Sequence, residues 1–301
     1  MKKIKTSSYF TFIIETKNNK FVRQYKRDKR EIHGYPRTVP VNKVMKLLEN
    51  SNVYAPSILR NRLKYIDEEY IDGIQVDDNI DNTLILDCIS NYIIQMSSIN
   101  CHSIYKYIGW GNNTEYLMFL IDNLIRVKDT FSVKTKDILD KLDIGNTRLN
   151  ELKNIKLDNS RKMSLIHGDI HKGNMIMREG KIYLLDWELA TYGDIAYEVA
   201  THSLLMNYNL EDTEYLIDKI SDNIDFDRDN FFRDIRVYVL YELLRRCYLN
   251  LNKIDRMMSK GENIENEIEI LYKYYDRLVE IIGISKLPKE KVKYLLEVNH
   301  E

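Results

Sequence analysis

The chain has 301 residues, of which 44% are hydrophobic, enough for one large core or two lobes. Lys and Arg number 45 against 46 for Asp and Glu, so the one-sided positive charge of nucleic-acid-binding proteins is absent. The cysteines, Cys88, Cys101 and Cys247, are too far apart in sequence to suggest a disulfide framework or a zinc site, and they fit a reducing cytoplasm. The N-terminal residues do not match the pattern of a secretory signal peptide, and no stretch approaches the roughly 18 apolar residues of a membrane span. We therefore expect a cytoplasmic protein with neither a nucleic-acid nor a membrane partner.

The first quarter of the chain predicts a small sheet-rich lobe. Residues 9–16 and 21–25 are β-branched and aromatic runs around the turn-like KNNK, which indicates a hairpin. Pro40 is suited to open a helix that extends to about residue 49. A further strand over residues 63–70 ends before Gly73. We expect an N-terminal nucleotide-binding lobe over residues 1–73.

From about residue 80 the apolar spacing becomes helical. The first helix has one apolar face, from Leu84 to Ile99. Further helical patterns cover residues 115–127, 134–153, 211–223, 236–250 and 264–282. Strands followed by helices indicate the α+β class, and we expect a two-lobed fold with a larger, mainly helical C-terminal lobe over residues 74–301.

One segment, LIHGDIHKGNMIMREGKIYLLDWELATYGD at 165–194, interrupts the helices. Residues 175–177 and 182–185 are short apolar strands around a turn that contains Gly180, so they predict a hairpin. Asn174 precedes the first strand and Asp186 follows the second, so the hairpin would bring an amide and a carboxylate oxygen together. Mg²⁺ commonly takes one or two protein oxygens and completes its shell with water and phosphate, so we expect a Mg²⁺ site here.

Asp169 lies five residues before Asn174, between Gly168 and Gly173. A carboxylate in this loop could accept or orient the proton of an attacking hydroxyl, while cations neutralise a triphosphate. Phosphoryl transfer requires little more than this positioning and charge neutralisation. The pattern therefore predicts a phosphoryl-transfer site.

The motifs HGDIHKGNMIM and IYLLDWE resemble the catalytic core of the aminoglycoside phosphotransferase and choline kinase superfamily, whose fold is similar to protein kinases. The resemblance places Asp169 on the catalytic aspartate and Asn174 and Asp186 on the metal ligands. It places His167 on a histidine that packs beneath the loop, and Asp194 on an aspartate that braces the loop from the next helix. It implies a kinase that uses Mg²⁺ and ATP or GTP to phosphorylate a small-molecule hydroxyl.

In the N-terminal lobe FVRQY resembles the third strand of that family, so Arg23 is the candidate contact to the α- and β-phosphates. Ser7 and Ser8 stand where a phosphate-covering loop is expected. The family usually pairs the cation with a helical Glu, and none is in register near residues 41–42; Glu31 in a loop is the alternative.

EEYIDG resembles the hinge strand that receives adenine. The residues that would line the purine site are Glu69, Tyr70 and Ile71.

Three acceptor classes remain open. A cationic antibiotic requires carboxylates, for which the candidates are Glu188, Glu198, Glu211, Asp212 and Glu242. Choline or ethanolamine requires an aromatic cage, for which the candidates are Trp187, Tyr192, Tyr238 and Tyr241. Sugars or other metabolites require neither. The segment after Asp186 resembles the antibiotic-kinase branch more closely, so we expect an aminoglycoside-like acceptor and a role in resistance, with Trp187, Glu188, Tyr241 and Glu242 as the candidate acceptor contacts.

Two other classes of protein compete with this interpretation. A kinase fold without catalysis would explain the absent helical Glu, whereas the intact Asp169, Asn174 and Asp186 favour an enzyme. A zinc cluster of His167, His171 and Asp169 lacks the helical spacing of zinc proteases, and GWGNNT lacks the Lys-Ser/Thr of a nucleotide loop. ATP or GTP as donor, and the oligomeric state, are left open by the sequence.

Overall fold

The computed structural model describes residues 2–5, 9–16, 19–26 and 39–282. Two compact units divide the chain. Of these described residues, the first unit comprises those up to 26, 39–113 and 159–235. The second comprises residues 114–158 and 236–282. These compact units are not the two predicted lobes, since each unit contains separate segments of the chain. The expected lobe boundary at residue 73 therefore stays a prediction.

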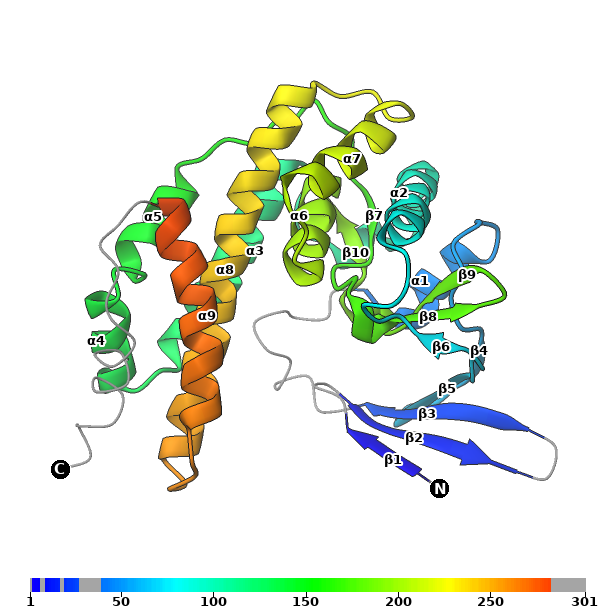
Figure 1. Cartoon of the computed structure of the whole chain (residues 1–301), viewed down its shortest axis with the longest axis horizontal. Coiled ribbons are helices and arrows are strands. Elements are labelled where there is room, and N and C mark those ends of the chain that lie inside the picture. The colour runs from blue at the N-terminus through cyan, green and yellow to red at the C-terminus, as the bar shows by residue number, and fades with distance from the viewer. Residues whose placement is uncertain (1, 6–8, 17–18, 27–38, 283–301) are drawn as a thin grey trace. The chain divides into compact units, whose positions relative to one another are not determined.

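A five-stranded antiparallel sheet, whose first strands are dark blue in Figure 1, begins the first unit. Its strands are β1 (Lys2–Lys5), β2 (Tyr9–Glu15), β3 (Lys20–Lys26), β4 (Ile58–Asn61) and β5 (Tyr65–Glu69), in the order β1-β2-β3-β5-β4. β2 and β3 form the predicted hairpin, with Tyr9 opposite Lys26 and Glu15 opposite Lys20. The predicted helix after Pro40 is α1 (Val41–Leu48), which buries Val41, Val44 and Leu48.

Two smaller sheets carry the segment that interrupted the helical pattern. β6 (Ile74–Gln75), β8 (Met175–Arg178) and β9 (Lys181–Leu184) form one sheet, and β7 (Ser164–Ile166) pairs with β10 (Thr191–Gly193) in the other. Gly73, just before β6, lies so close to β8 that a Cβ there would be 2.4 Å from the Met177 carbonyl oxygen. The chain entering β6 therefore requires glycine for a steric reason.

Three longer helices complete the first unit. They are α2 (Asn82–Ser98), α6 (Ile195–Met206) and α7 (Leu210–Ser221), with the 3-10 helices η1 (His102–Tyr107), η2 (Lys172–Asn174) and η3 (Trp187–Leu189) between strands and helices. α2 packs against α7 and β7, and α6 packs against β7 and α7. Nearly every residue of α6 is buried, so α6 forms part of this unit's core.

The second unit is helical. Its elements are α4 (Val133–Lys141), α5 (Asn146–Lys153), α9 (Glu265–Ile282) and most of α3 (Asn113–Asp129) and α8 (Arg228–Met258). The predicted apolar stripe on α9 is confirmed, because Ile268, Leu271, Tyr275 and Leu278 are all buried. The predicted helix over 134–153 is instead two helices separated by a turn.

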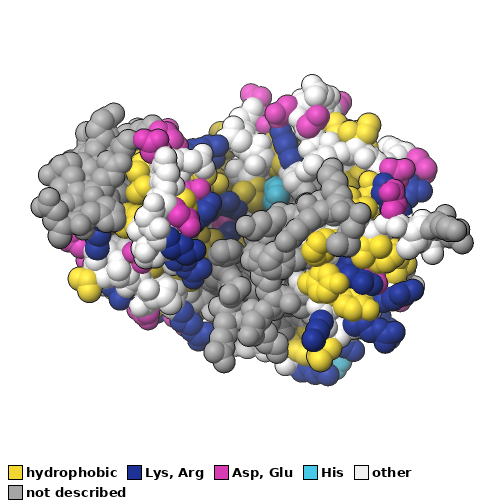
Figure 2. Space-filling model, turned by 90° about the horizontal axis from the view of Figure 1, so that it is seen from below, with side chains coloured by type: hydrophobic (Ala, Val, Ile, Leu, Met, Phe, Trp, Pro, Cys, Tyr) yellow, Lys and Arg dark blue, Asp and Glu magenta, His cyan; other side chains and the backbone are white. Residues whose placement is uncertain are grey.

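The small antiparallel N-terminal sheet and the larger helical part confirm the predicted α+β class. Within the described ranges, no helix is both long and apolar enough to cross a bilayer. Figure 2 shows Lys and Arg side chains among hydrophobic and acidic ones on the face that it presents. That face therefore carries no uniform charge.

Candidate functional site

The hairpin β8–β9 brings together the two ends of its segment, as the sequence predicts. Met175 lies opposite Leu184 and Arg178 opposite Lys181. The turn residues Glu179 and Gly180 have φ of 54° and 72°, the left-handed conformation that two-residue hairpin turns require. The Leu185 amide also donates to the Asn174 carbonyl at 2.8 Å, which extends the ladder by one step. Asn174 and Asp186 are therefore held at the same end of the hairpin.

Asp186 has an unusual backbone conformation. It is left-handed, with φ 59° and ψ 60°, and it begins η3. For a residue other than glycine, this conformation costs roughly 1–3 kcal/mol, and such residues cluster at functional sites. This strain supports a functional role for Asp186.

Asn174 contacts the catalytic-loop carboxylate directly. Its Nδ2 donates to the Asp169 carbonyl oxygen at 3.0 Å and to Asp169 Oδ2 at 3.2 Å. With the amide nitrogen directed at Asp169, Oδ1 is the Asn174 atom suited to bind a cation. The loop thus joins the candidate base to a candidate metal ligand.

The oxygen donors fit Mg²⁺ better than zinc. Asn174 and Asp186 offer one amide and one carboxylate oxygen, which is a common protein contribution to a Mg²⁺ site. Throughout the part of the chain that the structure describes, no three His, Cys, Asp or Glu side chains gather as a metal cluster would. Two protein ligands fit an ion that binds mainly with a triphosphate.

His167 lies fully buried beneath the loop, as the resemblance implies. Its Nε2 lies 2.9 Å from the Leu185 carbonyl oxygen, which can only accept, so Nε2 carries the proton. Its Nδ1 accepts from the Asp169 amide at 3.3 Å, and its ring lies 4.5 Å from the Trp187 ring. Burial lowers the His167 pKa to about 4. A neutral histidine therefore ties the catalytic loop to the strand that leads to Asp186.

Glu198 contacts the catalytic loop directly from α6. Glu198 Oε2 accepts from the amides of His167 at 2.5 Å and Gly168 at 2.9 Å. Asp194 caps α6 by accepting from the Ala196 amide at 2.9 Å, and it binds Arg161 through both carboxylate oxygens. The side chain one helical turn after Asp194 thus reaches the loop amides, and the bracing role expected of Asp194 stays a prediction.

Glu198 and His202 on α6 contact the catalytic loop, and the sequence analysis did not predict these contacts. Burial raises the pKa of Glu198 to about 7, against the opposing effect of the two amides that it accepts. His202 Nδ1 donates to the Ile170 carbonyl at 3.0 Å, and burial lowers its pKa to about 4. The i, i+4 spacing of Glu198 and His202 could have indicated one face of α6.

Arg23 has a carboxylate partner, but on the neighbouring strand. Asp67 lies opposite Arg23 in the β3–β5 pair. Arg23 Nε and Nη2 donate to the two Asp67 carboxylate oxygens at 2.6 and 2.8 Å, and its guanidinium carbon lies 4.1 Å from the Tyr65 ring centroid. Arg23 therefore pairs with a carboxylate on a strand, and its contact with the nucleotide phosphates stays a prediction. Ser7, Ser8 and Glu31 lie outside the described residues.

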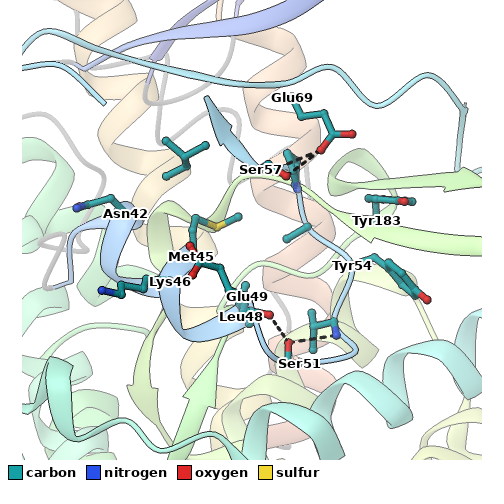
Figure 3. A pocket seen from close by; sticks show the side chains of 14 residues that line it. Asn42, Met45, Lys46, Leu48, Glu49, Ser51, Tyr54, Ser57, Glu69 and Tyr183 are labelled. Carbon is teal, nitrogen blue, oxygen red and sulfur yellow. Dashed lines mark hydrogen bonds between the residues drawn. The ribbon is translucent and has the colours of Figure 1, made fainter. Parts of the chain in front are cut away.

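The three hinge residues have different surroundings. Glu69 accepts from Ser57 Oγ at 3.1 Å and lines a cavity of about 610 Å³, together with residues of α1 and Tyr183 (Figure 3). Lys20 Nζ lies 3.8 Å from the Tyr70 ring centroid, and Ile71 is buried. The resemblance implies that adenine would hydrogen-bond to the backbone groups of residues 69–71. This role stays a prediction.

The candidate acceptor residues use polar atoms within the chain. Trp187 is buried, and its Nε1 donates to the Leu184 carbonyl at 2.8 Å; Glu188 is also buried. Tyr241 donates to the Leu120 carbonyl at 3.2 Å inside the second unit. There Glu242, fully buried, pairs with Arg245 and Arg246. Their contact with an acceptor stays a prediction.

Sequence comparison identifies relatives of the catalytic segment. Residues 138–231 match the sequence model described as "Phosphotransferase enzyme family". A LicA homologue from Mycoplasma capricolum subsp. capricolum is 27% identical over 172 residues, 56% of this chain and 63% of that protein. A LicA homologue from Metamycoplasma hominis is 24% identical over 230 residues, 74% of this chain and 84% of that protein. The match therefore spans less than two thirds of the first relative and most of the second.

Solved structures share the fold at low sequence identity. An ethanolamine kinase from Plasmodium vivax has a TM-score of 0.68 and 16% identity, covering 94% of this chain and 83% of that one. Choline kinase LicA from Streptococcus pneumoniae has a TM-score of 0.59 and 16% identity, and the match covers 91% of this chain and 89% of that one. The gentamicin complex of APH(2")-IIa has a TM-score of 0.61 and 12% identity, and the match covers 95% of this chain and 91% of that one. At this low identity the solved structures show the shared fold, which is the predicted protein-kinase-like fold, and the family model matched at residues 138–231 bears out the predicted resemblance.

Proposed function

We propose that this protein is a Mg²⁺-dependent small-molecule kinase that transfers the γ-phosphoryl group of ATP or GTP to an acceptor hydroxyl. The observation that carries the proposal is the hairpin that holds Asn174 and Asp186 at one end, while Asn174 also binds Asp169. This arrangement joins a base to metal-binding oxygens, and phosphoryl transfer requires little further covalent chemistry. The matched family model over residues 138–231 supports the same reaction class.

Asp169 is proposed to accept the proton of the acceptor hydroxyl. The acceptor oxygen bonds to the γ-phosphorus as the bond from that phosphorus to the β–γ bridging oxygen breaks. Asn174 and Asp186 would hold Mg²⁺, which neutralises the charge of the triphosphate oxygens. His167 and Glu198 hold the loop from beneath through the amide contacts described above. Together these contacts position Asp169 before an acceptor arrives.

The nucleotide is proposed to bind through the N-terminal sheet and hinge. The Arg23 guanidinium has five N–H donors, of which Nε and one on Nη2 serve Asp67, and the guanidinium also bonds the Tyr25 side chain. A remaining donor would contact a phosphate. Ser7 and Ser8 would cover the phosphates, and Glu69, Tyr70 and Ile71 would receive the purine through their backbone groups.

For the acceptor, we propose an amino alcohol of the choline or ethanolamine class. The solved LicA is a choline kinase, and two LicA homologues are among the relatives of this chain; the fold match to an ethanolamine kinase supports the same class. The antibiotic-type acceptor expected from sequence, with its role in resistance, becomes the second candidate. Burial does not separate the two classes, because three of the five candidate carboxylates, Glu188, Glu198 and Glu242, are buried, and so are three of the four candidate aromatic side chains, Trp187, Tyr238 and Tyr241. The preference therefore rests on the relatives.

Turnover against a panel of acceptors tests the proposal. Mg²⁺-dependent consumption of ATP and of GTP would be measured with choline, ethanolamine, aminoglycosides, tuberactinomycin-type peptides and macrolides. We expect choline or ethanolamine to raise turnover about tenfold or more above the background, and Asp169→Ala to abolish the increase. Stimulation by an antibiotic alone would select the second candidate. If no acceptor raises turnover and Asp169→Ala leaves the background unchanged, the chain is a binding protein with a kinase fold.

A further inference from the structure

His171 lies in the catalytic loop, two residues after Asp169, and the proposed reaction assigns it no role. Its ring is only 35% exposed. Its Nδ1 accepts from the Gly173 amide at 3.0 Å, and this contact caps η2, which ends at Asn174. The ring is thus fixed by the backbone of its own loop.

Gly173 makes room for this ring. A Cβ at position 173 would lie 2.6 Å from His171 Cε1 and 2.9 Å from Nδ1, both closer than non-bonded atoms can approach. The imidazole therefore packs against the backbone at a position where only glycine fits without displacement. Gly173 therefore accommodates the ring, and its amide binds Nδ1 in the observed orientation.

This orientation determines which ring nitrogen faces Asp169. Because Nδ1 accepts a hydrogen bond, its lone pair is used there and the proton of the neutral ring is on Nε2. Nε2 lies 3.5 Å from Asp169 Oδ2, a favourable electrostatic contact that is longer than a normal hydrogen bond. Contacts of this length at a catalytic group commonly tighten when the substrate binds.

The same Asp169 oxygen also receives Asn174 Nδ2, at 3.2 Å. Oδ2 therefore accepts from the Asn174 amide and has His171 Nε2 within 3.5 Å on another side. If the Nε2 contact tightens, two donors on this oxygen restrict rotation of the carboxylate about its Cβ–Cγ bond. That rotation decides the direction from which the carboxylate meets an acceptor hydroxyl.

We propose that His171 is a positioning residue for Asp169, which holds the carboxylate through Nε2–H while Gly173 holds the ring through Nδ1. The inference rests on the proposed kinase function, because positioning matters only if Asp169 serves a reaction. A purely structural role would be limited to the cap of η2. The two roles use different ring nitrogens and can be separated by substitution.

Two substitutions divide the ring's contacts. Asn is a good capping residue, and His171→Asn places its amide oxygen near the position of Nδ1, so it keeps the cap and removes the donor to Asp169. His171→Gln extends further and can place an amide donor near the position of Nε2. We expect His171→Asn to lower kcat about tenfold with the KM for nucleotide unchanged, and His171→Gln to keep kcat within about threefold of the parent.

His102→Asn is the matched control, because His102 is exposed and belongs to η1, away from the loop sequence. It should leave kcat unchanged. A parental kcat in His171→Asn would overturn the proposal, and so would equal losses in the Asn and Gln variants. A raised KM at unchanged kcat would also overturn it, because the effect would then lie in binding.

The contact can also be tested without turnover. In protein labelled with ¹⁵N-histidine, with His171→Asn identifying the signal, we expect the neutral ring of His171 to carry its proton on Nε2. Asp169→Asn should shift the Nε2 resonance. A proton on Nδ1 would overturn the inference whatever the activity. An Nε2 proton in a protein without kinase activity would instead contradict the proposed function.

Discussion

Asp169 and Asp186 are both carboxylates of the candidate site, but their local structures differ. Asp169 lies in the loop held by His167 and Asn174, whereas Asp186 ends the hairpin in a left-handed conformation. A base that takes a proton acts mainly in the transition state, whereas a metal ligand also contributes to nucleotide binding. Substitution should therefore separate the two roles.

We expect Asp169→Ala to lower kcat by about a thousandfold or more with nearly unchanged nucleotide affinity. Asp186→Ala should lower kcat and also weaken binding of the Mg²⁺–nucleotide complex, because it removes a cation ligand. Steady-state kinetics and calorimetric titration with a non-hydrolysable nucleotide measure the two effects. Asp218→Ala, at an exposed carboxylate that pairs with Arg228, is the control. Equal effects of Asp169→Ala and Asp186→Ala on nucleotide affinity would contradict the assignment of one carboxylate as base and the other as metal ligand.

Glu198 predicts a pH dependence of stability. Its pKa in the folded protein, about 7, lies above the ordinary value of 4.5 because the side chain is buried. The folded state thus binds the Glu198 proton more tightly than the unfolded state does. The contribution of protonated Glu198 to the free energy of unfolding is therefore complete below about pH 4.5 and is lost as pH rises through 7. We expect the Glu198→Gln variant, which cannot titrate, to show a smaller decline in the free energy of unfolding between pH 5 and 8. Denaturant unfolding across that range measures the difference, and identical slopes in the two proteins would contradict it.

At the scale of elements, the start of α6 depends on a buried ion pair. Asp194 caps the helix and binds Arg161, which also binds Asp234 at 3.0 Å, and all three side chains are fully buried. Removal of one partner leaves a buried charge with incomplete compensation, which is costly. This ion pair lies directly before the turn that carries Glu198 beneath the catalytic loop.

We expect Asp194→Ala to lower the free energy of unfolding by about 3 kcal/mol or more, since it removes both a helix cap and a partner of Arg161. Urea denaturation followed by circular dichroism measures the loss. The exposed pair Arg228–Asp218 is a matched control, and Asp218→Ala should cost at most about 1 kcal/mol. A similar small cost for Asp194→Ala would show that α6 does not depend on the ion pair.

The helices show where local pattern is insufficient. The sequence predicts one helix over 134–153, but the chain turns between α4 and α5, where Asp143 has φ 53° and Gly145 precedes α5. The apolar spacing continues across this turn because both helices bury one face. Conversely, α8 extends from Arg228 to Met258, well beyond the predicted 236–250. Burial of further residues on α8 stabilises turns that periodicity alone does not indicate.

At the scale of the whole molecule, ligand binding should be coupled to unfolding. The proposed nucleotide contacts, on β3 and at the hinge, and the metal-binding oxygens of the catalytic hairpin belong to the first compact unit. A ligand that binds only the folded protein stabilises it by about 2.7 kcal/mol at a hundred times its dissociation constant. For a chain of this length, this corresponds to an increase in Tm of about 4 °C.

We therefore expect a non-hydrolysable ATP or GTP analogue with Mg²⁺ to raise Tm by about 4 °C at saturation. The increase should be much smaller with EDTA or in Asp186→Ala. Thermal unfolding followed by circular dichroism, with and without each ligand, measures it. An equal increase without Mg²⁺ would contradict the assignment of Asn174 and Asp186 as metal ligands.

The sequence by itself determined the α+β class, the β2–β3 hairpin and the hairpin between Asn174 and Asp186. These features depend on short-range information, since strand alternation and turn residues act over a few positions. The motif around Asp169 also sufficed for the family resemblance, because the motif is contiguous.

Only the tertiary structure decided which distant side chains meet. Asp67 lies 44 positions from Arg23, and Glu198 lies 30 and 31 positions from the loop amides that it binds. It also decided that Tyr241 and Glu242, which share a helix pattern open to several interpretations, are buried in the second unit. The physical reason is that a carboxylate can satisfy any nearby donor, and nearness between segments follows from strand register and helix packing rather than from sequence spacing.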